Sequence, residues 1–183
     1  MQVKETSISG CYEILPEMFR DGRGIFVKTF HSNVFASNGL VTSFVEEYYS
    51  ISKKNVLRGM HFHAPPKEHT KVVYCVYGRV MDAVVDLRVG SSTYGMFETF
   101  ELSSEKANMV YISPGLAHGF YVNSRVAIMV YKVTTVYSAK HDSGILWSSL
   151  GLPWPGENPI VSARDSSFGR LDEFDSPFNL KNP

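Results

Sequence analysis

Apolar and polar residues alternate along most of the chain between residues 41 and 134. Alternation with a period of two is typical of β-strands, because side chains two positions apart share a face. The segments with this pattern are 41–51, 57–63, 71–77, 80–88, 97–102, 109–112, 118–122 and 126–134. Many short strands at close spacing, with almost no helical periodicity, predict a mainly β protein built as an antiparallel sandwich or barrel.

Turn residues separate these segments. Residues 21–24, Asp-Gly-Arg-Gly, predict a hairpin or a loop between strands that presents Arg23. Residues 31–40 predict a short helix that an Asn-Gly pair closes with a left-handed cap. Gly78-Arg79 lies between two strongly β segments, and this is the clearest hairpin signature in the chain.

The 183 residues fit one domain, and 44% hydrophobic residues are enough for a core. We expect a single domain at 1–183, with a core at about 22–165 and a tail at 166–183. Beyond Tyr137 the alternation is lost, and two tryptophans with neighbouring prolines predict an irregular, packed segment. The polar tail predicts a short helix or a loosely docked end.

The charge balance argues against polyanionic partners. Eighteen basic residues match eighteen acidic ones, so no overall field attracts nucleic acid or an anionic membrane. The start of the chain lacks the apolar run of a signal peptide, and no segment reaches the roughly 20 apolar residues of a membrane span. We therefore expect a soluble, cytoplasmic protein in which Cys11 and Cys75 are reduced thiols.

The stretch from residue 55 to residue 71 concentrates the candidate chemistry. In the strand 57–63, His61 and His63 share one face, and Met60 and Phe62 share the other. Two prolines then end the strand, and Lys71 begins the next one. Lysine is almost never fully buried without a partner, so a Lys71 directed inward predicts a functional cavity.

Two later strands add polar groups to this cavity. Tyr131 alternates with Met129 and Val133, which directs its hydroxyl inward, and His118 follows a tight Pro-Gly turn. A lone histidine or tyrosine in a strand is more often a hydrogen-bonded structural group. A phenol, an ammonium and two imidazoles together require partners or a polar ligand.

A metal site is an alternative interpretation of the histidines. His61 and His63 followed by Glu68, with His118 on a later strand, resemble the ligand pattern of metal-binding cupins and would suit iron or manganese. Against a metal, Lys71 places a cation close by, and the Pro-Pro turn separates His63 from Glu68.

Several motifs together resemble one known family. Val56-Leu-Arg-Gly-Met-His-Phe62, Pro114-Gly-Leu-Ala-His-Gly-Phe120, Tyr131-Lys132 and Pro159-Ile-Val-Ser-Ala-Arg-Asp165 occur in the order found in the dTDP-4-dehydrorhamnose 3,5-epimerase family. The resemblance runs from about residue 22 to residue 165. It implies a cupin-like double-sheet jelly roll with short peripheral helices, a homodimer, no metal or other cofactor, and a nucleoside-diphosphate 4-keto-6-deoxysugar as substrate.

The resemblance also implies roles for individual residues. His61 is the base that removes a proton beside the ketone, and Asp165 orients its ring. Tyr131 is the acid on the opposite face of the sugar, and Lys71 stabilises the enolate. The expected contacts with diphosphate, sugar or nucleoside base are Arg23, Phe26, Arg58, His118 and Tyr137.

The chain departs from the family at positions associated with substrate recognition. Lys28 stands where the family usually has Glu, and Glu46-Glu47-Tyr48 replaces the usual Gln-Asp-Asn. We include Lys28, Glu46 and Tyr48 among the candidate binding residues. The changes leave open a nucleotide other than dTDP, and inversion at C3 alone or at C5 alone.

Three other functions remain open on the sequence. A 3,4-ketoisomerase would use the same enolate chemistry and would differ in the connectivity of its product. A metal-dependent cupin enzyme would lose activity with a chelator. A sugar-binding module that is not an enzyme would keep its function after His61→Ala.

Overall fold

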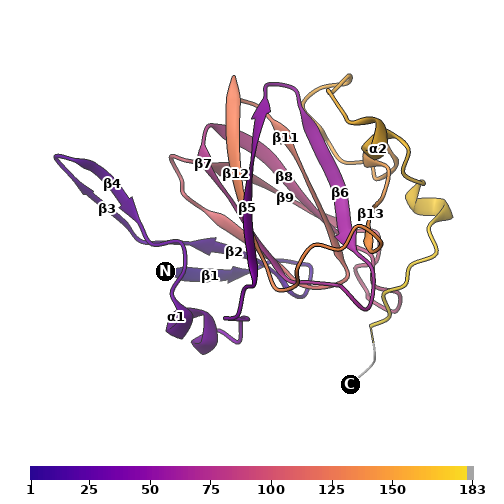
Figure 1. Ribbon diagram of the computed structural model, residues 1–183, viewed down its shortest axis with the longest axis horizontal. Helices are drawn as coiled ribbons and strands as arrows, with labels where there is room; N and C mark the ends of the chain where they lie inside the picture. Colours follow the sequence, from indigo (N-terminus) through magenta and orange to yellow (C-terminus); the bar gives the residue numbers. More distant parts are fainter. Residues whose placement is uncertain (181–183) are drawn as a thin grey trace.

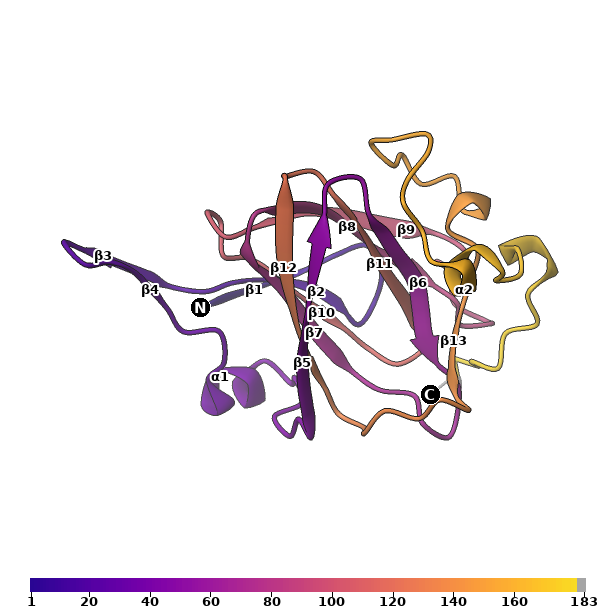
Figure 2. The same cartoon turned by 45° about the horizontal axis from the view of Figure 1, so that its top comes forward.

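The computed structural model describes residues 1–180 and consists mainly of two antiparallel sheets that face each other (Figures 1 and 2). The six-stranded sheet has the order β1 (Gln2–Glu5), β2 (Cys11–Leu15), β10 (Met109–Ile112), β7 (Lys71–Tyr77), β12 (Val126–Val133) and β5 (Glu46–Lys53). The five-stranded sheet has the order β13 (Asp142–Gly144), β6 (Leu57–His63), β11 (Leu116–Val122), β8 (Arg79–Asp86) and β9 (Phe97–Ser103).

The remaining elements lie outside the two sheets. The hairpin β3 (Met18–Asp21) and β4 (Gly24–Val27) projects from the body of the molecule (Figure 1). Short helices lie at the periphery: α1 (Ser32–Ser37), η1 (Trp147–Ser149), α2 (Ala163–Ser166) and η2 (Leu171–Glu173). The predicted mainly β class with short peripheral helices is confirmed, as are the hairpin at residues 21–24 and the helix within residues 31–40.

The main core lies between the sheets. Val73 and Met129 from the six-stranded sheet pack in one apolar cluster with Val84 and Phe120 from the five-stranded sheet. Each of these side chains is almost fully buried. Alternation along the strands therefore supplies one inward-facing row per strand, as the sequence predicted.

The outer faces of both sheets are also covered. Phe35 of α1 packs with Tyr111 against the six-stranded sheet. On the five-stranded sheet, Phe62 and Val85 pack against the C-terminal segment, including Phe178. Cover on both faces explains why β11 is buried at every position instead of alternating with solvent.

The prediction of a hairpin at Gly78-Arg79 is wrong. Strands β7 and β8 follow each other in the chain but belong to different sheets, so the turn at Gly78 carries the chain from one sheet to the other. Gly78 has φ +81°, and a Cβ at this position would lie 2.1 Å from the carbonyl oxygen of Val126. The glycine therefore serves a crossing between layers, which a local turn signature does not distinguish from a hairpin.

Two further segments differ from the prediction in detail. Residues 41–45 are irregular, and the strand begins at Glu46. The tail is docked: Phe178 is buried, and Val89 forms a bridge with Asn179. The last three residues of the predicted tail, 181–183, lie outside the described residues. No helix within residues 1–180 is long and apolar enough to cross a membrane.

Substituting Gly78 tests the importance of this crossing. Gly78→Ala should lower the free energy of unfolding by about 1–3 kcal/mol, because the added methyl overlaps the backbone of Val126. Urea unfolding followed by circular dichroism measures the change. Gly169→Ala is the control, since a Cβ there meets no atom within 4 Å, and it should leave stability nearly unchanged. Equal stability of the two variants would contradict this account.

Candidate active site

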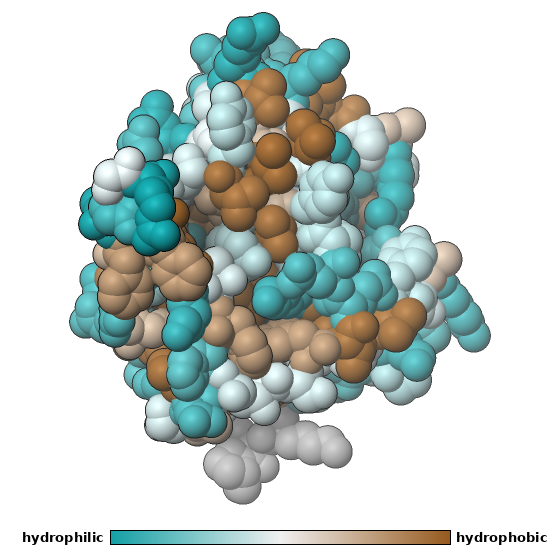
Figure 3. Space-filling model, turned by 60° about the vertical axis from the view of Figure 1, so that its left-hand side comes forward, coloured by the Kyte–Doolittle hydropathy of each residue, from teal (hydrophilic) through white to brown (hydrophobic). Residues whose placement is uncertain are grey.

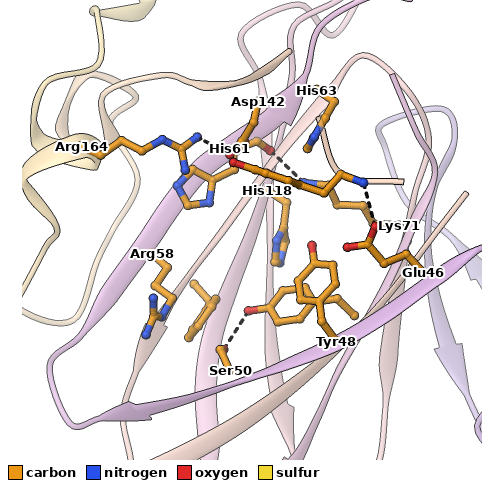
Figure 4. A pocket seen from close by; sticks show the side chains of 13 residues that line it. Glu46, Tyr48, Ser50, Arg58, His61, His63, Lys71, His118, Asp142 and Arg164 are labelled. Carbon is orange, nitrogen blue, oxygen red and sulfur yellow. Dashed lines mark hydrogen bonds and ion pairs between the residues drawn. The ribbon is translucent and has the colours of Figure 1, made fainter. Parts of the chain in front are cut away.

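A cavity of about 320 Å³ opens between the two sheets, and Figure 4 shows the side chains that line it. Strands β5, β7 and β12 contribute from the six-stranded sheet, and β6, β11 and β13 contribute from the five-stranded sheet. The lining residues are Glu46, Tyr48, Ser50, Arg58, His61, His63, Lys71, His118, Phe120, Tyr131, Tyr137, Asp142 and Arg164. This volume is at the lower end of the range for small-molecule sites.

A bulge in β6 allows Arg58 and His61 to line the same cavity. These residues are three positions apart, so strict alternation would direct them to opposite faces. On the neighbouring strand β11, the partners of His61 and Arg58 are His118 and Phe120, which are two positions apart. The extra residue on β6 resets the alternation at Gly59, which has φ +132°.

Asp165 holds the imidazole of His61. Its carboxylate lies 2.9 Å from His61 Nε2 and accepts a hydrogen bond of 3.0 Å from the backbone N–H of Gly59. Asp165 belongs to α2, which Ser162 caps by accepting from the Asp165 N–H. Burial raises the pKa of the Asp165 carboxyl, but the hydrogen bond from His61 and the other donors outweigh burial and lower it overall.

A second histidine and carboxylate pair lies deeper between the sheets. His118 Nε2 is 2.7 Å from Asp82 Oδ2, and both side chains are almost fully buried. Burial raises the pKa of Asp82, and the neighbouring His118 opposes this rise. The pair fixes the orientation of the His118 ring at the inner wall of the cavity.

Tyr131 reaches the cavity from the sheet opposite His61. Its hydroxyl lies 3.2 Å from the hydroxyl of Ser50, and its ring stacks on the ring of Tyr48. Burial raises the pKa of Tyr131 above its ordinary value, so the phenol is protonated at neutral pH.

Lys71 is buried, with its side chain beside the strand that carries His61. Its ammonium donates to the backbone carbonyl of His61 at 3.3 Å. Burial lowers the pKa of Lys71 to about 8, while the Asp142 carboxylate raises it and the Arg164 guanidinium lowers it. The ammonium form therefore dominates at neutral pH.

The histidines do not form a set of metal ligands. The rings of His63 and His69 lie with centroids 4.4 Å apart and planes tilted by 38°. Burial followed by the charge of Lys71 lowers the pKa of both, to about 2 for His69. In the described part of the chain, no three His, Cys, Asp or Glu side chains converge on one point. The geometry therefore gives the metal-dependent alternative no support.

The sequence analysis missed an ion pair at the cavity. Arg164 Nη2 lies 2.8 Å from Asp142 Oδ2 (Figure 4). The guanidinium also lies over the ring of Phe168. Asp142 lies in a segment without alternation, so no pattern marked it. Arg164 had a signal, because it immediately precedes Asp165 in a recognised motif. Ser50 also had one, because it alternates with Glu46 and Tyr48.

The structure places most of the predicted site residues together. Among the predicted contacts, Glu46, Tyr48, Arg58, His118 and Tyr137 line the cavity with His61, Lys71 and Tyr131. Three predicted contacts lie elsewhere in the protomer. Arg23 and Phe26 are exposed on the β3–β4 hairpin, and Lys28 lines a separate hollow with Glu17 and His31.

Known proteins share both the sequence and the fold. The profile of the family described as dTDP-4-dehydrorhamnose 3,5-epimerase matches residues 5–173. The Shigella flexneri dTDP-4-dehydrorhamnose 3,5-epimerase is 40% identical over 168 residues, which are 90% of this chain and 93% of that protein. The Streptomyces niveus dTDP-4-dehydrorhamnose 3-epimerase is 38% identical over 168 residues, covering 90% of this chain and 81% of that protein.

A solved structure shows that the similarity extends to the three-dimensional fold. The dTDP-6-deoxy-D-glucose-3,5-epimerase of Legionella pneumophila, solved in complex with dTDP-4-keto-L-rhamnose, superposes with a TM-score of 0.92 and 33% identity. The superposition covers 97% of each chain, and it confirms the cupin-like jelly roll. Since the profile and these relatives span nearly the whole sequence, the chain belongs to the dTDP-4-dehydrorhamnose 3,5-epimerase family of nucleotide-sugar epimerases.

Proposed function

We propose that residues 1–183 form one epimerase domain, which inverts C3, C5 or both in a nucleoside-diphosphate 4-keto-6-deoxysugar. The observation that carries this proposal is the placement of His61 and Tyr131. They come from facing sheets and line one cavity, with the buried ammonium of Lys71 in its wall. Inversion needs a base and an acid on opposite faces of the sugar, and this cavity supplies both.

His61 acts as the base through Nδ1. Its other ring nitrogen, Nε2, is engaged with Asp165, so that carboxylate holds a proton on Nε2 and leaves the Nδ1 lone pair for the substrate. The C4 ketone acidifies the hydrogens on C3 and C5. His61 takes one of them, and Asp165 stabilises the imidazolium that forms.

Lys71 and Tyr131 complete the reaction. Removal of the proton leaves an enolate with negative charge on the C4 oxygen, and the ammonium of Lys71 stabilises that charge. Tyr131 then donates its proton to the opposite face of the same carbon, which inverts the centre. His61 releases its proton and Tyr131 regains one from solvent, so each step is a proton transfer and none changes an oxidation state.

Cations at the cavity suit the diphosphate. Arg58 and Arg164 both line it, and arginine binds phosphate oxygens in a bidentate manner. Arg58 is oriented by a hydrogen bond from its Nε to Ser52 Oγ at 3.0 Å. The ligand of the Legionella relative is a dTDP-sugar, which supports a nucleoside-diphosphate sugar for this chain. The free, buried thiols of Cys11 and Cys75 fit the reducing cytoplasm, where we place the reaction.

We also propose that the protein is a homodimer in which the β3–β4 hairpin of one protomer contacts its partner. Phe19 and Phe26 pair on this hairpin with ring centroids 6.2 Å apart, and both are more than half exposed. Figure 3 brings this side of the molecule forward and shows apolar side chains exposed on it. An isolated two-stranded hairpin is marginal in water, so a partner surface would stabilise it and would bring Arg23 toward the partner's cavity.

Deuterium exchange tests the reaction and the role of Tyr131. In D₂O, the enzyme should incorporate deuterium with inversion into a 4-keto-6-deoxysugar from a panel of dTDP-, CDP- and GDP-sugars. Tyr131→Phe should still exchange while inversion falls by about 10²–10⁴-fold, because His61 can return a deuteron to the face it deprotonated. NMR measures exchange, configuration and connectivity. Absence of exchange with the whole panel, or a product with a moved carbonyl, would refute the proposal.

The pH profile tests Lys71. Its lowered pKa means that the ammonium is present below about pH 8 and is lost as the pH rises through that value. The kcat/KM value should therefore fall above about pH 8, since it reports the free enzyme. Lys71→Arg should lower the rate and abolish this decline, and Lys106→Met on the surface should keep it. A wild-type profile that stays flat through pH 9 would exclude this role.

Phe19→Ser/Phe26→Ser tests the homodimer. Removing both rings should convert a species of twice the chain mass into a monomer and should raise KM, because Arg23 would no longer reach a partner. Light scattering after size exclusion measures the mass. Tyr94→Ser, which alters a partly exposed aromatic side chain in the loop between β8 and β9, is the control and should remain dimeric. A wild-type monomer would rule out the arrangement.

A further inference from the structure

Tyr48 lies beside the proposed acid, Tyr131, on the neighbouring strand of the same sheet. Strand β5 pairs with β12 in the register Tyr48↔Tyr131, so the two phenols are cross-strand neighbours on the inner face. Glu46 and Ser50, two positions to either side on β5, also line the cavity. Tyr49 and Ile51 face outward, with exposures of 67% and 59%.

The two tyrosine rings stack closely. Their centroids are 4.8 Å apart and their planes differ by 16°. The edge of the His118 ring lies on another side of Tyr131, with centroids 6.2 Å apart and planes at 74°. Ser50 contacts the Tyr131 hydroxyl. These contacts surround Tyr131, and the Tyr48 ring covers one face of the Tyr131 ring.

The packing around the Tyr131 ring bears on how many carbons are inverted, because C3 and C5 lie on opposite sides of the C4 ketone. One base and one acid invert both carbons in turn only if the sugar reorients about C4, or if the acid moves to the second carbon. In a cavity of about 320 Å³, the Tyr48 ring takes up space that either movement would need. Tyr48 is 42% exposed at the cavity. Its partial burial, followed by the charges of Glu46 and Asp142, raises its pKa to about 12, so the phenol is neutral.

We propose that Tyr48 is a specificity-determining residue whose ring, stacked on Tyr131, limits the enzyme to inversion at a single carbon beside the ketone. This inference rests on the proposed epimerase function and adds the number of centres inverted. The name of the Streptomyces niveus relative states a single centre, so the family accommodates such an outcome. In the present chain, the restriction comes from the volume of the aromatic ring and not from its hydroxyl.

Deuterium incorporation in variants of Tyr48 tests the proposal. With a 4-keto-6-deoxysugar substrate in D₂O, the wild-type enzyme should incorporate deuterium with inversion of configuration at only one of the two carbons. Tyr48→Asn and Tyr48→Leu should invert the second carbon at a rate about 10-fold or more above the wild-type rate, as expected for a change in pocket volume. Tyr48→Phe keeps the ring and should still invert a single carbon. Tyr94→Asn is the surface control and should behave like the wild type.

The possible outcomes distinguish the proposed role of Tyr48 from the proposed epimerase function. Inversion at both carbons in the wild type would overturn the inference and leave the epimerase function standing. Inversion of a single carbon in both Tyr48→Asn and Tyr48→Leu, or of both carbons in Tyr48→Phe, would also overturn it. If the wild type exchanged at neither carbon, the epimerase function would fail, and the inference would fail with it. Circular dichroism confirms that each variant is folded.

Discussion

The carboxylate of Asp165 connects the backbone of the site to its chemistry, because it accepts hydrogen bonds from His61 and from the N–H of Gly59. Gly59 is the residue at which β6 bulges, and a Cβ there would lie 2.5 Å from the Cα of Gly119 on β11. Gly59 therefore links the bulge that brings Arg58 and His61 to one cavity with the carboxylate that holds the His61 ring.

Local sequence patterns predicted the positions of strands but not how the strands assemble into sheets. Alternation located the strands from β5 to β12, because each sheet has one face on the common core, but it did not locate β1, β2 or β13. It did not reveal sheet membership, which depends on contacts between distant residues, and so the turn at Gly78 was taken for a hairpin. The bulge at Gly59 was equally invisible, since a single extra residue appears only when a strand is compared with its neighbour.

The site was predictable where residue chemistry is unusual for its setting. A lysine at the start of an apolar strand and a tyrosine in an inward-facing row pointed to Lys71 and Tyr131, and both line the cavity. Asp165 is far from His61 in sequence, so the resemblance to a family supplied it, not spacing. Asp142 begins β13, a three-residue strand too short to show alternation, and it carried no signal. Arg23 was a predicted ligand contact, but the structure places it on the projecting β3–β4 hairpin.

Strand β5 ends the six-stranded sheet and pairs on one side with β12. Residues proposed to transfer protons or to stabilise the enolate lie on β6, β7 and β12, whereas Glu46 and Tyr48 belong to this outermost strand. A substitution on β5 therefore reshapes the wall of the cavity without removing any of those three groups.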